Sequence, residues 1–323
     1  MAQKKVEASV VRMNSLVLVE ALPLDLNPVL VYLNGLKLSG RYTQTQALNI
    51  ASRIMAGCDC MSLNWAKIEW QHVDALRSVL IEMYHPAMSN KILCAVRGVL
   101  KRAWMLNLLS AEDYHKAVSV GGVRGETVPA GRELTMGEIS ALMDACVRDR
   151  TSAGVRDAAI IGLLYSGGVR RAEVIGLRFQ DFTPENGKLI IRGKGSKERT
   201  LYLNNGGLDV LIDWLNVRGS ELGSLFNPIN KAGEIVNREL SNQAVYNILV
   251  KRGKEAGVSH FSPHDFRRTF VSNLLEAGAD LTTVSKMCGH ASVVTTARYD
   301  RRGEDAKQKA SQLLHLPYVR RSK

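Results

Sequence analysis

The chain has 323 residues, of which 46% are hydrophobic, so it is long enough and apolar enough for two domains with cores of their own. Its 43 Lys and Arg residues outnumber its 31 Asp and Glu residues and give a formal net charge of +12, which suits a polyanionic partner. The 5 cysteines form no Cys-x-x-Cys pair, and no stretch resembles a signal peptide or a membrane span. We therefore expect a cytoplasmic protein with free thiols and no membrane partner, and we exclude a disulfide-rich secreted module.

A break in the helical pattern falls at residues 119–132, which read SVGGVRGETVPAGR. The stretch is rich in glycine, contains Pro129 and has no helical periodicity, so it predicts an interdomain linker. The predicted domains are residues 1–118 and 133–323. Both contain an excess of basic residues, so a polyanion would contact both.

The first domain is helical in pattern. Apolar residues recur at spacings of three and four, which predicts a bundle of about four helices and no strand. The stretches are 27–37, 43–56, 68–83 and 89–107. The last stretch carries Lys91, Arg97, Lys101 and Arg102, which are candidate DNA contacts, although a solvated basic face explains them equally well.

The second domain is predicted to be mainly α with a small antiparallel β-sheet. Short strand-like runs at 188–192 and 198–203 flank a glycine-rich turn, which indicates a hairpin. A final helix is expected to begin at Ser292 and to carry Tyr299. The other predicted helices are 134–148, 156–165, 171–177, 208–218, 241–256, 262–277 and 281–287.

Two motifs are suited to phosphate binding. His264 and Arg267 share the first turn of a helix that begins at Ser262-Pro263, where free N–H groups attract anions and an arginine fork matches two phosphate oxygens. Arg170 follows a Gly-Gly turn, and Glu173 lies three residues further, where it could orient the guanidinium. Taken singly, each motif is explained better by an ordinary solvated helix end.

Two further features carry possible chemistry. Lys194 lies at the tip of the predicted hairpin, close to Lys197 and Arg199, and a lysine there could enter a DNA groove or donate a proton. His290 precedes Tyr299 in the segment GHASVVTTARYD. A basic surface hairpin and an ordinary core or surface tyrosine are the plain alternatives.

In their order and spacing, these segments resemble the tyrosine recombinases, also called the phage-integrase family, and the Xer-type members especially. The resemblance covers about half of the chain, from Leu134 to Tyr299, whereas the first domain resembles the family's core-binding domain only by pattern and position. It implies two domains that close around DNA as a C-shaped clamp. The matching segments are YSGGVRRAEVIGLRFQDF, IRGKGSKERTLYL, FSPHDFRRTFVSNLLEAGADLTTVSKMCGH and TTARYD.

The resemblance also implies roles for single residues. Tyr299 falls at the nucleophile and Glu173 at an acidic residue that supports the first arginine, while Lys197 and Arg199 are candidate DNA contacts on the hairpin. The implied catalytic residues are Arg170, Lys194, His264, Arg267, His290 and Tyr299.

The expected activity is site-specific cleavage and rejoining of duplex DNA through a 3′-phosphotyrosine bond. No cofactor and no metal site are predicted, since the arginines would supply the positive charge that Mg²⁺ supplies in nucleases. The resemblance implies a monomer in free solution and a homotetramer on two synapsed recombination sites. The apolar tail residues Leu313, Leu314 and Leu316 are predicted to dock into a neighbouring protomer, with packing on their own domain as the alternative.

The sequence departs from the family pattern in two places. Arg171 stands where many members carry a hydrophobic or small residue, and the tail DRRGEDAKQKASQLL is more charged than Xer-type tails and resembles those of transposon- and plasmid-borne integrases. Integration, excision and resolution therefore all stay open. The competing classes are a type IB topoisomerase or telomere-resolving enzyme, and a DNA-binding relative that no longer cleaves.

Overall fold

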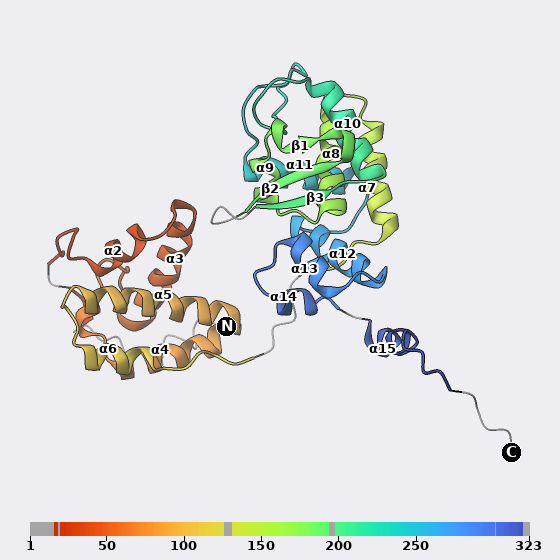
Figure 1. Cartoon of the computed structure of the whole chain (residues 1–323). Helices are drawn as coiled ribbons and strands as arrows, with labels where there is room; N and C mark the ends of the chain where they lie inside the picture. The colour runs from red at the N-terminus through yellow and green to blue at the C-terminus, as the bar shows by residue number, and fades with distance from the viewer. Residues whose placement is uncertain (1–15, 19, 126–130, 194–197, 301, 319–323) are drawn as a thin grey trace. The chain divides into compact units, whose positions relative to one another are not determined.

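The chain divides into two compact units, Met1–Ala130 and Gly131–Lys323, each with a separate hydrophobic core. The computed structural model describes residues 16–318 except 19, 126–130, 194–197 and 301. Figure 1 shows the first unit in red to yellow and the second in green to blue. The boundary lies within the stretch 119–132.

The first unit is a helical bundle around α5, which contacts α2, α3, α4 and α6 (Figure 1). Its helices are α2 (Pro28–Asn34), α3 (Leu38–Ala56), α4 (Trp70–Met83), α5 (Pro86–Met105) and α6 (Ala111–Val118), with a 3-10 turn η2 (Trp65–Lys67). The short helix α6 was not predicted, and its first turn is capped by the Ser110 side chain, which accepts from the N–H of Asp113. Among the described residues of this unit no strand forms, as expected, apart from an isolated bridge between Val17 and Leu63.

The second unit surrounds the helix α8, which is buried along most of its length and contacts α7, α10 and α12. The α-helices of this unit are α7 (Met136–Arg148), α8 (Ser152–Gly167), α9 (Arg171–Gly176), α10 (Gly206–Arg218), α11 (Asn242–Glu255), α12 (Pro263–Glu276), α13 (Leu281–Cys288), α14 (Val293–Ala297) and α15 (Gly303–Ser311). The 3-10 turns are η3 (Phe179–Asp181) and η4 (Pro184–Asn186). No helix in the described ranges is long and apolar enough to cross a membrane.

A small antiparallel sheet lies on one side of this unit. Its order is β1 (Phe182–Thr183), β2 (Lys188–Arg192) and β3 (Glu198–Tyr202), and Leu189 pairs with Leu201 in the core. The predicted hairpin is present, whereas β1 is too short to leave a sequence pattern. The predicted fold class, mainly helical with a small antiparallel sheet, is confirmed, while the hairpin residues Lys194 and Lys197 lie outside the described residues.

The end of α8 determines where the chain presents Arg170. Gly168 ends the helix in the left-handed region with φ of +56°, and a Cβ there would lie 2.3 Å from the ring of Phe270. Only glycine fits both the backbone conformation and this close approach. The chain therefore turns sharply, and Arg170 becomes the N-cap of α9.

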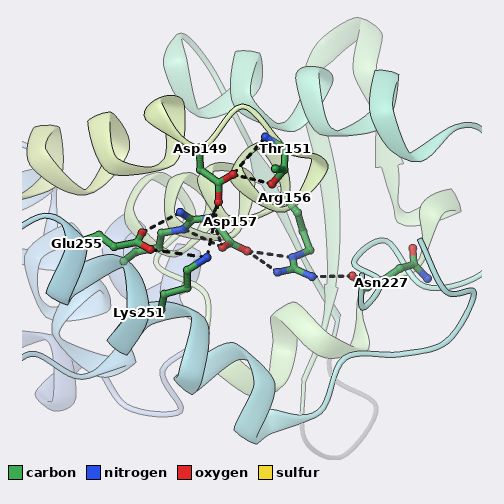
Figure 2. A network of polar contacts seen from close by, with 8 residues as sticks. Asp149, Thr151, Arg156, Asp157, Asn227, Lys251 and Glu255 are labelled. Carbon is green, nitrogen blue, oxygen red and sulfur yellow. Dashed lines mark hydrogen bonds and ion pairs between the residues drawn. The ribbon is translucent and has the colours of Figure 1, made fainter. Parts of the chain in front are cut away.

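A buried ionic network joins α7, α8 and α11 (Figure 2). Arg252 of α11, whose side chain is 1% exposed, lies 2.8 Å from Asp157 of α8 and 2.6 Å from Asp149 at the end of α7. Asp157 also accepts from Arg156, which donates to the carbonyl of Asn227. Buried charges are tolerated when each is paired in this way, so the network fixes how these three helices pack together.

The last part of the chain differs from the prediction. The helix that begins after Ser292 was expected to carry Tyr299, but α14 ends at Ala297, and the N–H of Tyr299 donates to the carbonyl of Thr296 in the turn that follows. The tail then forms α15, which was not predicted, since its sequence is almost wholly polar. Tyr299 therefore lies on a turn between two short helices.

Candidate active site

Arg267 is the most deeply buried charged group of the site. It lies on the first turns of α12 and is 2% exposed. Its Nη1 donates to the carbonyl of Gly168 at 2.7 Å, and its Nη2 donates to the carbonyl of Cys288 at 2.6 Å. Both carbonyls end helices, where backbone oxygens are unpaired and the helix dipole is negative, so they stabilise a buried cation. Each bonded nitrogen keeps a second N–H for another acceptor.

Arg170 is held by Glu173 at the start of α9. The Glu173 carboxylate accepts from the backbone N–H of Arg170 at 2.7 Å and from its Nη1 at 2.9 Å. The Nη2 of Arg170 also donates to the carbonyl of Gly289 at 3.4 Å. The glutamate therefore lies where the sequence predicted it could orient this guanidinium, and the Arg170 side chain is 44% exposed.

Arg199 has protein partners on all three of its nitrogens. Its Nη1 and Nη2 donate to the two oxygens of Glu173 at 2.9 and 2.8 Å, and its Nε donates to the carbonyl of Met287 at 2.8 Å. The sequence predicted a DNA contact at this residue, but its side chain is only 13% exposed. It joins strand β3 to α9 and to the end of α13.

The end of α13 is where these arginines meet. The consecutive carbonyls of Met287, Cys288 and Gly289 accept from Arg199, Arg267 and Arg170 respectively. Gly289 is the C-cap of the helix with φ of +61°, which turns the chain toward His290. Three guanidinium groups from separate elements are thus fixed on one helix terminus.

Tyr299 lies against two histidines and one arginine. Its Oη is 3.3 Å from Nε2 of His264, and its ring stacks with that of His290 at a centroid distance of 6.4 Å. The guanidinium of Arg268 lies 5.5 Å from the centre of the tyrosine ring. The Nδ1 of His290 is 2.8 Å from the hydroxyl of Thr296.

The surroundings set the charges of the site. Burial lowers the pKa of His290 to about 4, and the positive charges of Arg267 and Arg170 act in the same direction. Burial and the same kind of repulsion, chiefly from Arg267, lower the pKa of His264. Burial lowers the pKa of Arg267 to about 10, so this arginine stays charged at neutral pH while His290 is neutral.

Glu173 is ionised in this environment. Burial alone would raise its pKa, but hydrogen bonds from Arg199 and from the backbone and side chain of Arg170 lower the pKa to about 2. A carboxylate is therefore permanently available to both arginines at neutral pH.

A pocket of about 390 Å³ opens at this site. Arg170, Arg171, His264 and Arg267 line it together with Asn242 and Tyr246 of α11. Asn242 and Tyr246 were not predicted from the sequence. Their spacing of one helical turn, which puts them on the same face of α11, was the pattern that could have indicated them. Arg268 and Thr296 were also missed, because neither stands out from its neighbours in sequence.

The structure thus brings together the described members of the predicted catalytic set, which are Arg170, His264, Arg267, His290 and Tyr299. Lys194 lies outside the described residues. In the ranges that the structure describes, no group of three His, Cys, Asp or Glu side chains is placed to hold a metal ion.

The basic residues predicted as DNA contacts on α5 belong to the other unit. Lys101 is exposed and Lys91 is half-buried. Arg97 donates to the carbonyl of Val120, and Arg102 lies 3.4 Å from the sulfur of Met105. Arg97 is therefore engaged within its own unit. Lys91 and Lys101 are more available for a contact with DNA than the two arginines.

Comparison with known proteins identifies the family. The model of the phage integrase family matches residues 132–305. The chain is 31% identical to the tyrosine recombinase XerC of Haemophilus ducreyi over 72% of this chain and 75% of the relative. It is 34% identical to XerC of Alcanivorax borkumensis over 70% of this chain and 74% of that relative. The chain therefore belongs to the phage integrase family of tyrosine recombinases and is an enzyme of DNA recombination.

Solved structures share its fold. The integrase of transposon Tn1549, in complex with a circular intermediate DNA, matches with a TM-score of 0.65 over 90% of this chain and 99% of that chain, at 15% identity. A lambda integrase dimer bound to a COC′ core site matches with a TM-score of 0.60 over 87% and 77%, at 16% identity. At these identities the likeness is one of architecture.

The neutral state of His290 predicts a pH dependence of stability. The pKa of this histidine is about 4 in the folded protein and near 6.5 when unfolded, so between these values the unfolded chain binds the extra proton. The free energy of unfolding should therefore fall as the pH is lowered from about 6.5 toward about 4. Denaturant titrations across this range should show a shallower fall for His290→Gln.

The exposed His260 of the same unit provides the control, because it is solvated in both states. His260→Gln should keep the pH slope of the wild type. An unchanged slope in His290→Gln would show that this histidine is not held in the neutral form by its surroundings.

Proposed function

We propose that the pocket binds a phosphodiester of double-stranded DNA and that Tyr299 attacks it in site-specific recombination. The observation that carries the proposal is the 3.3 Å approach of the Tyr299 hydroxyl to His264, a residue that lines the pocket with Arg170 and Arg267. A nucleophile, a proton acceptor and two phosphate-binding cations therefore meet at one place.

The arginines and His290 would stabilise the charge that gathers on the nonbridging phosphate oxygens. Arg170 and Arg267 are held by protein acceptors and keep further N–H groups for this purpose. If Thr296 donates to Nδ1 of His290, the neutral ring has its N–H on Nε2 and can donate to the phosphate. Donors that are fixed before the reaction supply the largest part of such stabilisation.

The proton transfers would use His264 and Lys194, the second on the ground of the family resemblance alone. His264 would take the phenolic proton as the Tyr299 oxygen bonds to phosphorus, and its lowered pKa keeps it in the accepting form at neutral pH. The phosphorus–5′ oxygen bond then breaks, and Lys194 of the hairpin would protonate the departing oxygen. The DNA is left as a 3′-phosphotyrosine ester, which conserves the energy of the broken bond for rejoining.

DNA binding would extend beyond the pocket to both units. Lys91, Lys101 and Arg102 of α5 and Lys197 of the hairpin would contact phosphates, which position a duplex but carry no sequence information. We propose that domains at 1–118 and 133–323 both contact the duplex, in the cytoplasm.

We also propose assembly as a homotetramer on two synapsed sites, from monomers in solution. Leu313, Leu314 and Leu316 are 85%, 85% and 80% exposed, so packing against their own unit does not account for these apolar side chains. A neighbouring protomer would cover them in a cyclic head-to-tail arrangement.

The nucleophile assignment predicts that Tyr299→Phe forms no covalent protein–DNA adduct but still binds DNA, because only the phenolic oxygen is lost. The assay would use a duplex recovered from a randomised library by its binding to this chain and nicked so that the cleaved state is trapped. Tyr202→Phe, which changes an exposed tyrosine on β3, should form the adduct at the normal rate. An adduct with Tyr299→Phe would refute the assignment.

The assembly proposal predicts the behaviour of a double variant, Leu313→Ser with Leu314→Ser. Removing the apolar side chains should leave half-site binding by the monomer intact and abolish cooperative binding and recombination, as measured by gel shift and by exchange between two plasmid sites. Leu222→Ser, at an exposed leucine elsewhere, is the matched control. Recombination at the normal rate by the double variant would show that the tail is not the assembly element.

A further inference from the structure

The guanidinium of Arg199 has few hydrogen-bond donors left that could contact DNA. Its guanidinium makes a bidentate pair with Glu173 and a third bond to the carbonyl of Met287, all between 2.8 and 2.9 Å. Its side chain is 13% exposed and that of Glu173 is 6% exposed. A phosphate could recruit this arginine only by breaking the pair and leaving a buried carboxylate with fewer partners, which is costly.

The pair orients Glu173 toward Arg170. Each carboxylate oxygen accepts one bond from each arginine: Oε1 from the two Nη1 atoms, and Oε2 from the Nη2 of Arg199 and the backbone N–H of Arg170. The two planar groups of the bidentate pair fix each other's orientation. The direction in which Glu173 holds Arg170 therefore depends on Arg199.

Arg199 also supports the turn that holds Arg267. Its Nε donates to the carbonyl of Met287. The next carbonyl along the chain accepts from Arg267, and the one after that accepts from Arg170. A Cβ added at Gly289 would lie 3.2 Å from Cδ and from Nη1 of Arg199, so the guanidinium packs directly against the residue before His290. One side chain thus contacts the supports of Arg170 and Arg267, two of the arginines that line the pocket.

We propose that Arg199 is a positioning residue for DNA cleavage: it acts through Glu173 and the Met287–Gly289 turn to align Arg170 and Arg267, and it does not contact DNA. The proposal rests on the proposed function, because the aligned arginines are those assigned to the phosphate. It predicts an effect on the rate of cleavage and none on the affinity for DNA.

The test compares Arg199→Ala and Arg199→Lys with the matched control Arg192→Ala. Arg192 lies on β2 of the same hairpin and is also paired with a buried carboxylate, that of Asp181, and its second ion pair is with Glu198 of β3. Single-turnover adduct formation and equilibrium binding would be measured on the same nicked duplex at several salt concentrations. Thermal unfolding of each variant would show how much of it is folded at the assay temperature.

We expect Arg199→Ala to lower the adduct rate at saturating DNA by about 100-fold, the size of effect that a misplacement of about 1 Å produces. Its dissociation constant and the salt dependence of binding should stay close to those of the wild type. The adduct rate of Arg199→Lys should lie between those of Arg199→Ala and the wild type. The lysine keeps the positive charge, but an ammonium group cannot reproduce the bidentate pair and the Met287 bond together. Arg192→Ala should cleave at a rate close to the wild-type rate.

Two outcomes would overturn the proposal. Weaker binding with a salt slope reduced by about one would show that Arg199 contacts a phosphate. An equal loss of rate in Arg192→Ala would show that the hairpin as a whole, and not this residue, sets the rate.

A double-mutant cycle adds a readout that loss of stability alone would not produce. If Arg199 acts partly through Glu173, the loss of rate caused by Arg199→Lys should be smaller in a Glu173→Gln background than in the wild type. If Arg199→Lys lowers the adduct rate by the same factor in both backgrounds, the two residues act independently, which would contradict the coupling. Failure of the wild type to form an adduct would count against the proposed function, whereas normal rates in the Arg199 variants would count against this inference alone.

Discussion

The site depends on the unpaired carbonyl oxygens at the end of α13. A helix leaves its last carbonyls without backbone partners, and the dipole makes that end negative. Here the carbonyls of Met287, Cys288 and Gly289 are used to hold arginines from β3, α12 and the start of α9. The backbone thereby brings three positive groups together.

Holding like charges together has an electrostatic cost, which is visible in the lowered pKa of Arg267, to which burial contributes most and the charges of Arg170 and Arg199 add. The carbonyl acceptors and the ionised Glu173 offset that cost. The result is a set of donors held in place by the protein's own acceptors, which is what the proposed stabilisation of a phosphoryl transition state requires. Burial, reinforced by the same positive charges, lowers the pKa values of His264 and His290, and the proposed transfer of a proton from Tyr299 needs a neutral histidine.

Much of this site could be predicted from the sequence because its residues lie in short motifs. His264 and Arg267 share one helical turn, and Arg170 and Glu173 face each other across another, so local spacing was enough to pair them. The two strand-like runs on either side of a glycine-rich turn likewise predicted the hairpin. The end of α14 before Tyr299 was missed, because nothing in the sequence ends the helix at Ala297 rather than one turn later.

Long-range contacts could not be predicted in this way. Arg199 looked like one more basic residue on a surface hairpin, and only the fold brings it to Glu173 and Met287, which are far from it in sequence. The same holds for Arg268 beneath the ring of Tyr299, and for Asn242 and Tyr246 on the pocket wall.

The most direct test of the role of the α13 terminus is the adduct rate of Gly289→Ala compared with that of Gly278→Ala. Both glycines have positive φ, +61° and +94°, so an alanine strains the backbone at each. A Cβ at 278 meets nothing within 4 Å, whereas a Cβ at 289 lies 3.2 Å from Arg199. If the terminus aligns the arginines, Gly289→Ala should cleave far more slowly than Gly278→Ala at similar stability. Equal rates in the two folded variants would contradict the account.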